Sequence, residues 1–202
     1  MNEELISFSI KNATHRLILL HGWGADAGDL LPFAQELVGS IEKKIELLSL
    51  NAPDHHPQGV GRQWYKLFPT DWSEASVSVE NLKKRLIELS SEDMPLSKTF
   101  LLGFSQGAAM ALASGSCLPF AGLISCSGFP HQGWNPTSNC PPVLLIHGEQ
   151  DPVVPIKASQ RIADLLEIKQ LKYEFTSFQG GHEIPDQAIN KITNFIYSLV
   201  QT

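Results

Sequence analysis

Short apolar runs alternate with longer segments of helical periodicity along the whole chain, and this alternation limits how it can fold. Continuous apolar runs of four to six residues are typical of strands that are buried on both faces of a sheet. We expect such strands in the following segments: residues 16–20, 45–50, 99–102, 121–126 and 143–146. Residues 5–10 and 172–178 alternate apolar and polar side chains, which predicts strands near the two edges.

Helical patterns occupy most of the segments between these strands. Apolar residues recur at helical spacing from Val79 to Leu89, which predicts a helix over residues 77–90. The other expected helices span residues 29–41, 105–114, 156–166 and 184–200. The first of them has Asp29 in a position to cap it. Strands that alternate with helices predict an α/β fold, in which helices cover both faces of a mainly parallel sheet.

Length and composition narrow the domain organisation and the class of partner. A chain of 202 residues can form one substantial core, so we expect residues 1–202 to form a single domain. The net charge is −6, and no basic cluster is larger than Lys83-Lys84-Arg85, which argues against a nucleic-acid partner. No apolar run approaches ~18 residues, so we expect no stable membrane insertion. Neither composition nor pattern indicates an oligomeric state.

Cysteine usage and the first residues bear on the compartment. The three cysteines are scattered and form no CxxC pair, which favours a reducing cytoplasm over a disulfide framework or a zinc ribbon. The start of the chain is acidic and lacks the apolar run of a signal peptide. We therefore expect a cytoplasmic protein. His55 and His56 are adjacent to Asp54, but adjacent side chains rarely converge on one ion, so no metal site is expected.

The segment Gly103-Phe104-Ser105-Gln106-Gly107 is the central chemical signal. It lies between a predicted strand and a predicted helix, where a tight turn would strain the serine and hold its hydroxyl above the sheet. The flanking glycines would avoid clashes with the neighbouring backbone. Ser105 is therefore the candidate nucleophile.

A serine hydroxyl becomes a good nucleophile only when a base removes its proton, and histidine suits that task near neutral pH. Of the seven histidines, His182 follows the last predicted strand in a glycine-containing loop. We expect His182 to be the base, whereas His21 and His147 lie at strand ends and are expected to have structural roles.

A carboxylate has to orient the base and stabilise its charged form. Asp151 follows the strand at residues 143–146 and is the candidate, with Glu149 as the nearest competitor and Asp186 as a distant one. The backbone N–H of Gln106 is one expected oxyanion donor, and the glycine-rich turn after residues 16–20 offers the N–H of Trp23 as the second.

At these residues the sequence resembles the acyl-protein thioesterase and phospholipase/carboxylesterase family of α/β-hydrolases. The resembling segments are Leu20 to Asp26, Ala52-Pro53, Gly61 to Tyr65, Gly103 to Gly107, His147 to Pro155 and Gly181-His182. The resemblance implies a seven-stranded hydrolase sheet whose first strand is antiparallel. It also implies Ser105, Asp151 and His182 as a catalytic triad, the Trp23 and Gln106 amides as an oxyanion hole, ester or thioester substrates, and no cofactor.

The residues around the expected site give a first picture of the substrate. The segment between Cys126 and Pro142 is too short for a helical cap domain, so the site should be open. Trp64, Tyr65 and Phe129 are candidates for an acyl groove, although core packing is the alternative for each. We expect a small-molecule ester or thioester substrate, with a lysophospholipid or an acylated protein among the candidates.

Two other functions remain open from the sequence. A protein of the same fold could act as a ligand receptor without turnover, because fold does not fix function. A peptidase on the same scaffold is a third interpretation. The sequence departs from the family pattern at Ala108, at Ala27-Gly28 and at Lys66-Leu67, and the last change leaves the substrate preference open.

Overall fold

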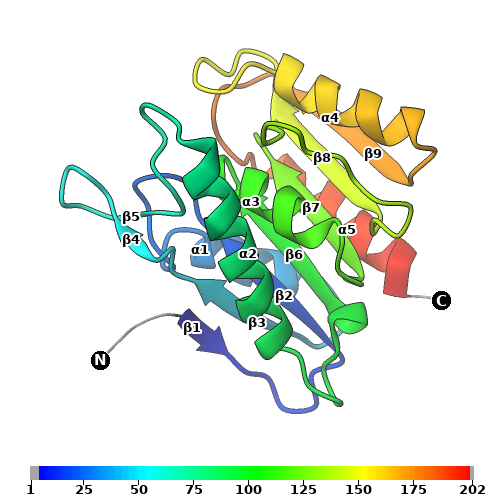
Figure 1. Cartoon of the computed structure of the whole chain (residues 1–202). Coiled ribbons are helices and arrows are strands. Elements are labelled where there is room, and N and C mark those ends of the chain that lie inside the picture. The colour runs from blue at the N-terminus through cyan, green and yellow to red at the C-terminus, as the bar shows by residue number, and fades with distance from the viewer. Residues whose placement is uncertain (1–4, 201–202) are drawn as a thin grey trace.

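The computed structural model describes residues 5–200, and its centre is a seven-stranded sheet (Figure 1). The strand order is β1-β3-β2-β6-β7-β8-β9. The strands are β1 (Leu5–Phe8), β2 (His15–Leu20), β3 (Ile45–Leu50), β6 (Thr99–Phe104), β7 (Gly122–Cys126), β8 (Val143–Gly148) and β9 (Tyr173–Phe178). Only β1 is antiparallel to its neighbour, and the other strands pair in parallel. The expected α/β-hydrolase architecture, with its antiparallel first strand, is confirmed.

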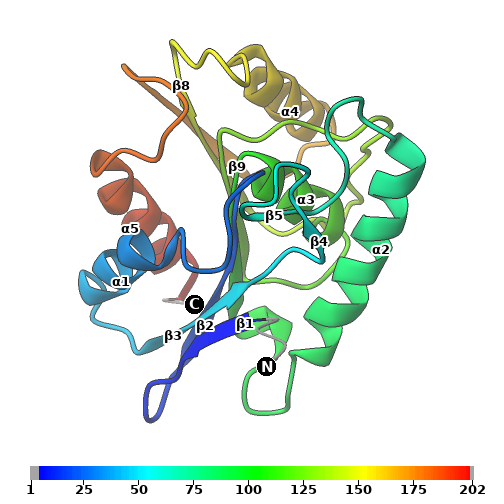
Figure 2. The same ribbon diagram turned by 90° about the vertical axis from the view of Figure 1, so that its left-hand side faces the viewer.

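Helices cover both faces of the sheet, as the edge-on view shows (Figure 2). On one face α1 (Leu31–Gly39) and α5 (Gln187–Val200) pack against each other and against the strands. On the other face lie α2 (Trp72–Glu88), α3 (Gln106–Gly115) and α4 (Lys157–Ile168). Two buried apolar clusters, one on each face, explain why the central strands read as continuous apolar runs.

Each of the five α-helices within residues 5–200 begins one to five residues from its expected start, and α5 begins at Gln187 rather than at residue 184. The starts of α1 and α2 show the physical reason. The first starts after Leu30 rather than Asp29, with Pro32 in its first turn, where a missing N–H costs nothing. Helix α2 starts at Trp72, five residues before the predicted start at residue 77, because Asp71 caps it by accepting hydrogen bonds from the N–H groups of Ser73 and Glu74.

The long segments between the core elements contain little regular structure. Residues 51–71 include a short hairpin of β4 (Asp54–His55) and β5 (Arg62–Gln63), which the sequence analysis did not anticipate. A single 3₁₀ turn, η1 (Leu96–Lys98), precedes β6. Residues 127–142 contain no helix or strand, so no cap domain stands over the carboxyl ends of the strands. Among the described residues, no helix is long and apolar enough to cross a membrane.

Candidate active site

Ser105 occupies a sharp turn between β6 and α3. Its backbone angles are φ 53° and ψ −117°, a conformation that costs a residue with a side chain roughly 1–3 kcal/mol. The turn can close only because Gly103 and Gly107 lack side chains. A Cβ at Gly103 would overlap the carbonyl of Gly107, and a Cβ at Gly107 would overlap the carbonyls of Leu20 and His21. The strained turn expected at Ser105 is therefore present, and packing maintains its strain.

His182 lies on the loop between β9 and α5, directly beside this turn. Its ring packs on Phe104, the residue before Ser105, with 4.8 Å between the ring centroids. Its Nδ1 lies 2.7 Å from Oδ2 of Asp151. Within residues 5–200, the hydroxyl of Ser105 makes no hydrogen bond, so none joins the serine to the imidazole in this structure.

Asp151 follows β8 in a tight turn, and its side chain is fully buried. Its Oδ1 accepts hydrogen bonds of 2.8 Å from the N–H groups of Val153 and Val154, while Oδ2 faces His182. Burial raises the pKa of the Asp151 carboxyl, but the hydrogen bonds from His182 and from the two amides outweigh it, so the pKa lies below the ordinary value. The carboxylate is thus ionised at neutral pH and can stabilise a charged imidazole.

The two carboxylates that competed with Asp151 lie elsewhere. Glu149 bonds the side chains of Ser177 and Gln179 at the surface. Asp186 is exposed in the turn that precedes α5. Of these three acids, only Asp151 contacts the ring of His182 in the described structure.

Two backbone amides beside Ser105 are available to a ligand. A Cβ placed on Gly22 would lie 3.5 Å from Cβ of Ser105, so the turn at residues 21–24 lies against the serine. Neither the N–H of Trp23 nor that of Gln106 has a hydrogen-bond partner in the part of the chain that the structure describes. The side chain of Trp23 is held separately, because its indole N–H donates to Oε1 of Gln63, and this bond orients the turn. Unpartnered N–H groups at a helix start are suitable donors for a developing oxyanion.

The side chain of Gln106 has a structural task that the sequence analysis missed. Its Oε1 accepts from the N–H of Trp64 at 3.1 Å, and its Nε2 donates to the carbonyl of Tyr65 at 2.8 Å. Trp64 also donates its indole N–H to the carbonyl of His21. The ring of His21 accepts from the N–H of Ala52, which agrees with the structural role expected for it. These bonds fasten the residue 51–71 segment beneath the Ser105 turn.

The aromatic residues proposed for an acyl groove have different environments. Trp64 and Tyr65 are buried, at 1% and 0% exposure, and the Tyr65 hydroxyl bonds the ring of His131. Contact of either side chain with a substrate remains a prediction, because both are packed inside the protein. Phe129 is half-buried, with its ring 6.4 Å from that of His131. Phe68, another aromatic residue of the 51–72 segment, is exposed and packs edge-on against Trp23.

The imidazole of His56 is buried against Trp23, at a ring-centroid distance of 4.0 Å, whereas His55 is exposed. In the described part of the chain, no three of the His, Cys, Asp and Glu side chains lie close enough together to hold a metal ion. The His55-His56 pair thus belongs to the packing of the Trp23 turn and the surface beside it.

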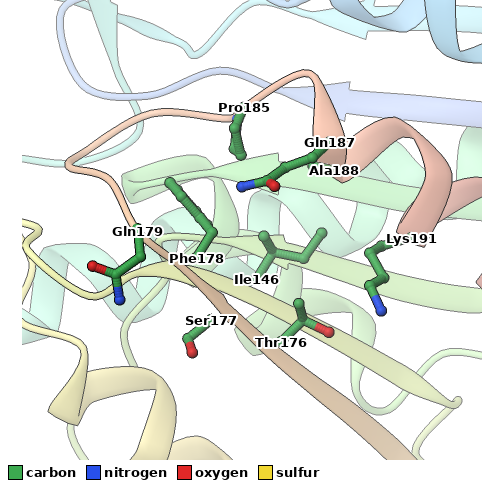
Figure 3. A pocket seen from close by; sticks show the side chains of 9 residues that line it. All are labelled: Ile146, Thr176, Ser177, Phe178, Gln179, Pro185, Gln187, Ala188 and Lys191. Atoms are coloured by element: carbon green, nitrogen blue, oxygen red, sulfur yellow. The ribbon is translucent and has the colours of Figure 1, made fainter.

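A cavity of about 520 Å³ lies between β9 and the start of α5, where Ile146, Phe178 and Gln187 line it (Figure 3). Gln179 and Pro185, near the two ends of the His182 loop, also line it. Ser105, Asp151 and His182 are not among its lining residues. The two ends of the loop that carries His182 thus border this cavity.

A family model described as phospholipase/carboxylesterase matches residues 1–200. The chain belongs to this phospholipase/carboxylesterase family. Acyl-protein thioesterase 1 of Saccharomyces cerevisiae is 28% identical to it, with 97% of each chain covered. The solved structure of esterase PE8 is also 28% identical and superposes with a TM-score of 0.85, covering 96% of this chain and 97% of that one. SOBER1 of Arabidopsis thaliana, at 25% identity and a TM-score of 0.72, covers 92% of this chain and 99% of that chain.

Membership of the phospholipase/carboxylesterase family confirms the resemblance drawn from the sequence. It also makes the chain a hydrolase of the α/β-hydrolase fold. The match covers nearly the whole chain and both ends of the sheet, so the family assignment does not depend on the segment Gly103 to Gly107 alone.

Proposed function

We propose that this enzyme cleaves carboxylic esters and thioesters through an acyl-enzyme on Ser105, with His182 as general base and Asp151 as its partner. The observation that carries the proposal is the 2.7 Å contact from His182 to the buried Asp151, made by a ring that packs beside the Ser105 turn. Family membership and the thioesterase and esterase relatives support the reaction class.

The protonation states follow from the contacts. A carboxylate only accepts hydrogen bonds, so the 2.7 Å contact requires a proton on Nδ1 of His182. The neutral ring then has its lone pair on Nε2, which is the nitrogen left to receive the proton of Ser105. Asp151 fixes this tautomer and stabilises the positive charge once the proton has moved.

The reaction takes two steps. Ser105 Oγ attacks the carbonyl carbon while His182 takes the proton, and the N–H groups of Trp23 and Gln106 stabilise the oxyanion. His182 then protonates the departing alcohol or thiol, and the acyl-enzyme forms. In the second step water attacks the acyl group while His182 takes a proton from it, and His182 then returns that proton to Ser105 Oγ as the acid is released. The contact between Ser105 and His182 closes when substrate binds, as is common for catalytic pairs that are loose without substrate.

The open site suits substrates whose leaving group is large. No helix or strand of residues 127–142 covers the carboxyl ends of the strands, so a lysophospholipid or an acylated protein can approach Ser105. The thioesterase relatives favour an acylated protein with a thioester. The exposed ring of Phe68 beside Trp23 offers an apolar surface to an acyl chain.

The setting of the enzyme is part of the same proposal. The whole chain, residues 1–202, would act as one hydrolase domain, since both apolar clusters pack on one sheet. A cytoplasmic location is supported by its three cysteines, all of which are free.

The test compares the wild type with Ser105→Ala on p-nitrophenyl esters of increasing acyl length and on an acyl thioester. We expect a loss of about 10⁴–10⁶-fold in kcat for the variant. A fluorophosphonate should label Ser105 in the wild type. Ser138→Ala, which removes an exposed serine, serves as the control and should behave as the wild type. Comparable turnover by Ser105→Ala would remove that residue from its role.

A further inference from the structure

A second buried histidine lies beside the Asp151 carboxylate, and the mechanism above does not use it. His147 is the penultimate residue of β8 and is fully buried. Its Nε2 lies 3.4 Å from Oδ2 of Asp151, compared with 2.7 Å for Nδ1 of His182. The Asp151 carboxylate therefore has an imidazole on each of two sides, one from the His182 loop and one from the sheet.

The hydrogen bonds of His147 determine its tautomer. Nε2 lies 2.7 Å from the carbonyl oxygen of Val154, which can only accept, so Nε2 bears the proton. Nδ1 lies 2.7 Å from Oγ of Ser159, a hydroxyl that can donate to it. Burial lowers the pKa of His147, which agrees with a neutral ring that accepts at Nδ1 and donates at Nε2. Both ring nitrogens are thus satisfied in an apolar interior.

These contacts close the turn that presents Asp151. At the start of the turn, Oδ1 of Asp151 accepts from the N–H groups of Val153 and Val154. At its end, the carbonyl of Val154 is bonded to His147, which belongs to the sheet. Ser159, which holds the other side of the ring, lies in α4 and is also fully buried. A shift of Val154 would therefore displace the N–H group that holds the carboxylate.

We propose that His147, held by Ser159 as the Nε2–H tautomer, is a positioning residue that fixes the turn at residues 151–154 so that Asp151 directs Oδ2 at His182. Because Nε2–H of His147 donates to the carbonyl of Val154, it does not compete for Oδ2 of Asp151. The shorter of the two imidazole contacts of Oδ2 is therefore the one with His182. This inference rests on the proposed function, because it assigns a task in orienting the base. A neutral, bonded imidazole at this position contributes geometry and not a second base.

Three variants test it. His147→Leu removes both hydrogen bonds at similar volume, His147→Gln restores a donor and an acceptor, and Ser159→Ala removes only the group that selects the tautomer. The control is Ser114→Ala, since Ser114 is equally buried but donates to the carbonyl of Met110 inside α3. Turnover is expressed per active site, counted by fluorophosphonate titration, so that unfolded protein does not enter the rate.

We expect His147→Leu to lower kcat per active site about 10- to 100-fold with KM nearly unchanged, because misplacing an orienting group affects chemistry and not binding. Ser159→Ala should cost about 3- to 10-fold, roughly the loss of one net hydrogen bond. His147→Gln should recover part of the loss, and Ser114→Ala should keep the wild-type kcat. If His147→Leu does not fold, Ser159→Ala decides the question, since alanine is well tolerated inside a helix.

A proton NMR signal separates positioning from mere stability. The proton between His182 and Asp151 should resonate far downfield, and its assignment is checked by its loss in Asp151→Asn. We expect this resonance to weaken in His147→Leu and Ser159→Ala and to persist in Ser114→Ala. The inference would be overturned if His147→Leu and Ser159→Ala both kept the wild-type kcat per active site and an unchanged resonance. A wild type without turnover or labelling would overturn the proposed function instead, and the resonance would still report on His147.

Discussion

Replacing Asp151 by asparagine tests the orientation of the base most directly, because the structure fixes how the new amide has to lie. Oδ1 of Asp151 accepts from two backbone N–H groups, those of Val153 and Val154. In Asp151→Asn the amide oxygen has to keep that position, since its NH₂ group would otherwise face two donors. The NH₂ group then takes the place of Oδ2 and faces Nδ1 of His182. In the wild type, Oδ2 lies 2.7 Å from that nitrogen.

The expected cost follows from this geometry. An NH₂ group only donates, so Nδ1 of His182 becomes an acceptor and its proton moves to Nε2, where it blocks removal of the serine proton. Losing a hydrogen bond to a charged group costs about 1.5–3 kcal/mol, and placing two donors face to face to regain the active tautomer costs roughly 1–3 kcal/mol more. The sum of about 2.5–6 kcal/mol corresponds to a loss of about 10²–10⁴-fold in kcat.

The assay is steady-state turnover of a p-nitrophenyl ester, with thermal unfolding measured on the same samples. We expect Asp151→Asn to fold, because its two backbone contacts survive, and to lose activity mainly through kcat. Asp186→Asn is the matched control, since Asp186 is exposed in the same loop region as His182 and should keep wild-type turnover. If Asp151→Asn retains activity within about tenfold of the wild type, the assignment of Asp151 as the partner of His182 is refuted.

Three further predictions concern stability. Gly107→Ala should destabilise the protein by more than about 3 kcal/mol or prevent folding, because its Cβ would overlap the carbonyl of Leu20, whereas Gly39→Ala has free space and should be neutral or mildly stabilising in thermal unfolding. Gln106→Ala keeps its backbone N–H but loses two buried side-chain hydrogen bonds, so urea unfolding should show a loss of about 2–3 kcal/mol, and an unchanged midpoint would contradict the bracing role. Burial lowers the pKa of His131 from 6.5 to about 4, so an unfolded chain binds a proton between these values that the folded chain does not. The free energy of unfolding should therefore fall as pH decreases from 6.5 to 4, by up to about 3 kcal/mol, and His131→Gln should remove this part of the dependence.

The central strands were predictable because a strand that is buried on both faces consists of a short run of apolar residues. A strand covered on both faces has to be apolar throughout, and β3 (Ile45–Leu50) matches its expected range. The start of α2 was missed although Asp71 and Glu74 have the spacing of a capping box, a signal that the apolar pattern alone does not use. The hairpin of β4 and β5 has two-residue strands and no apolar run, so it left no periodic signal.

The burial of the aromatic residues could not be predicted in the same way. Trp64 and Tyr65 lie in an irregular segment, where no periodicity assigns a side chain to the interior or to the site. They are buried because Gln106, from a distant part of the chain, bonds the backbone on which they lie.

The sequence by itself determined the alternation of strands and helices, the strained turn at Ser105, and the chemical types and chain order of Ser105, Asp151 and His182. These features are local, since they depend on periodicity, on glycine at tight turns and on which side chains can exchange protons. Tertiary structure alone decided which groups touch. The ring of His182 meets Phe104 and Asp151 only because the parallel sheet aligns the carboxyl ends of β6, β8 and β9. Such contacts join residues far apart in the sequence, and no local pattern specifies a distance between them.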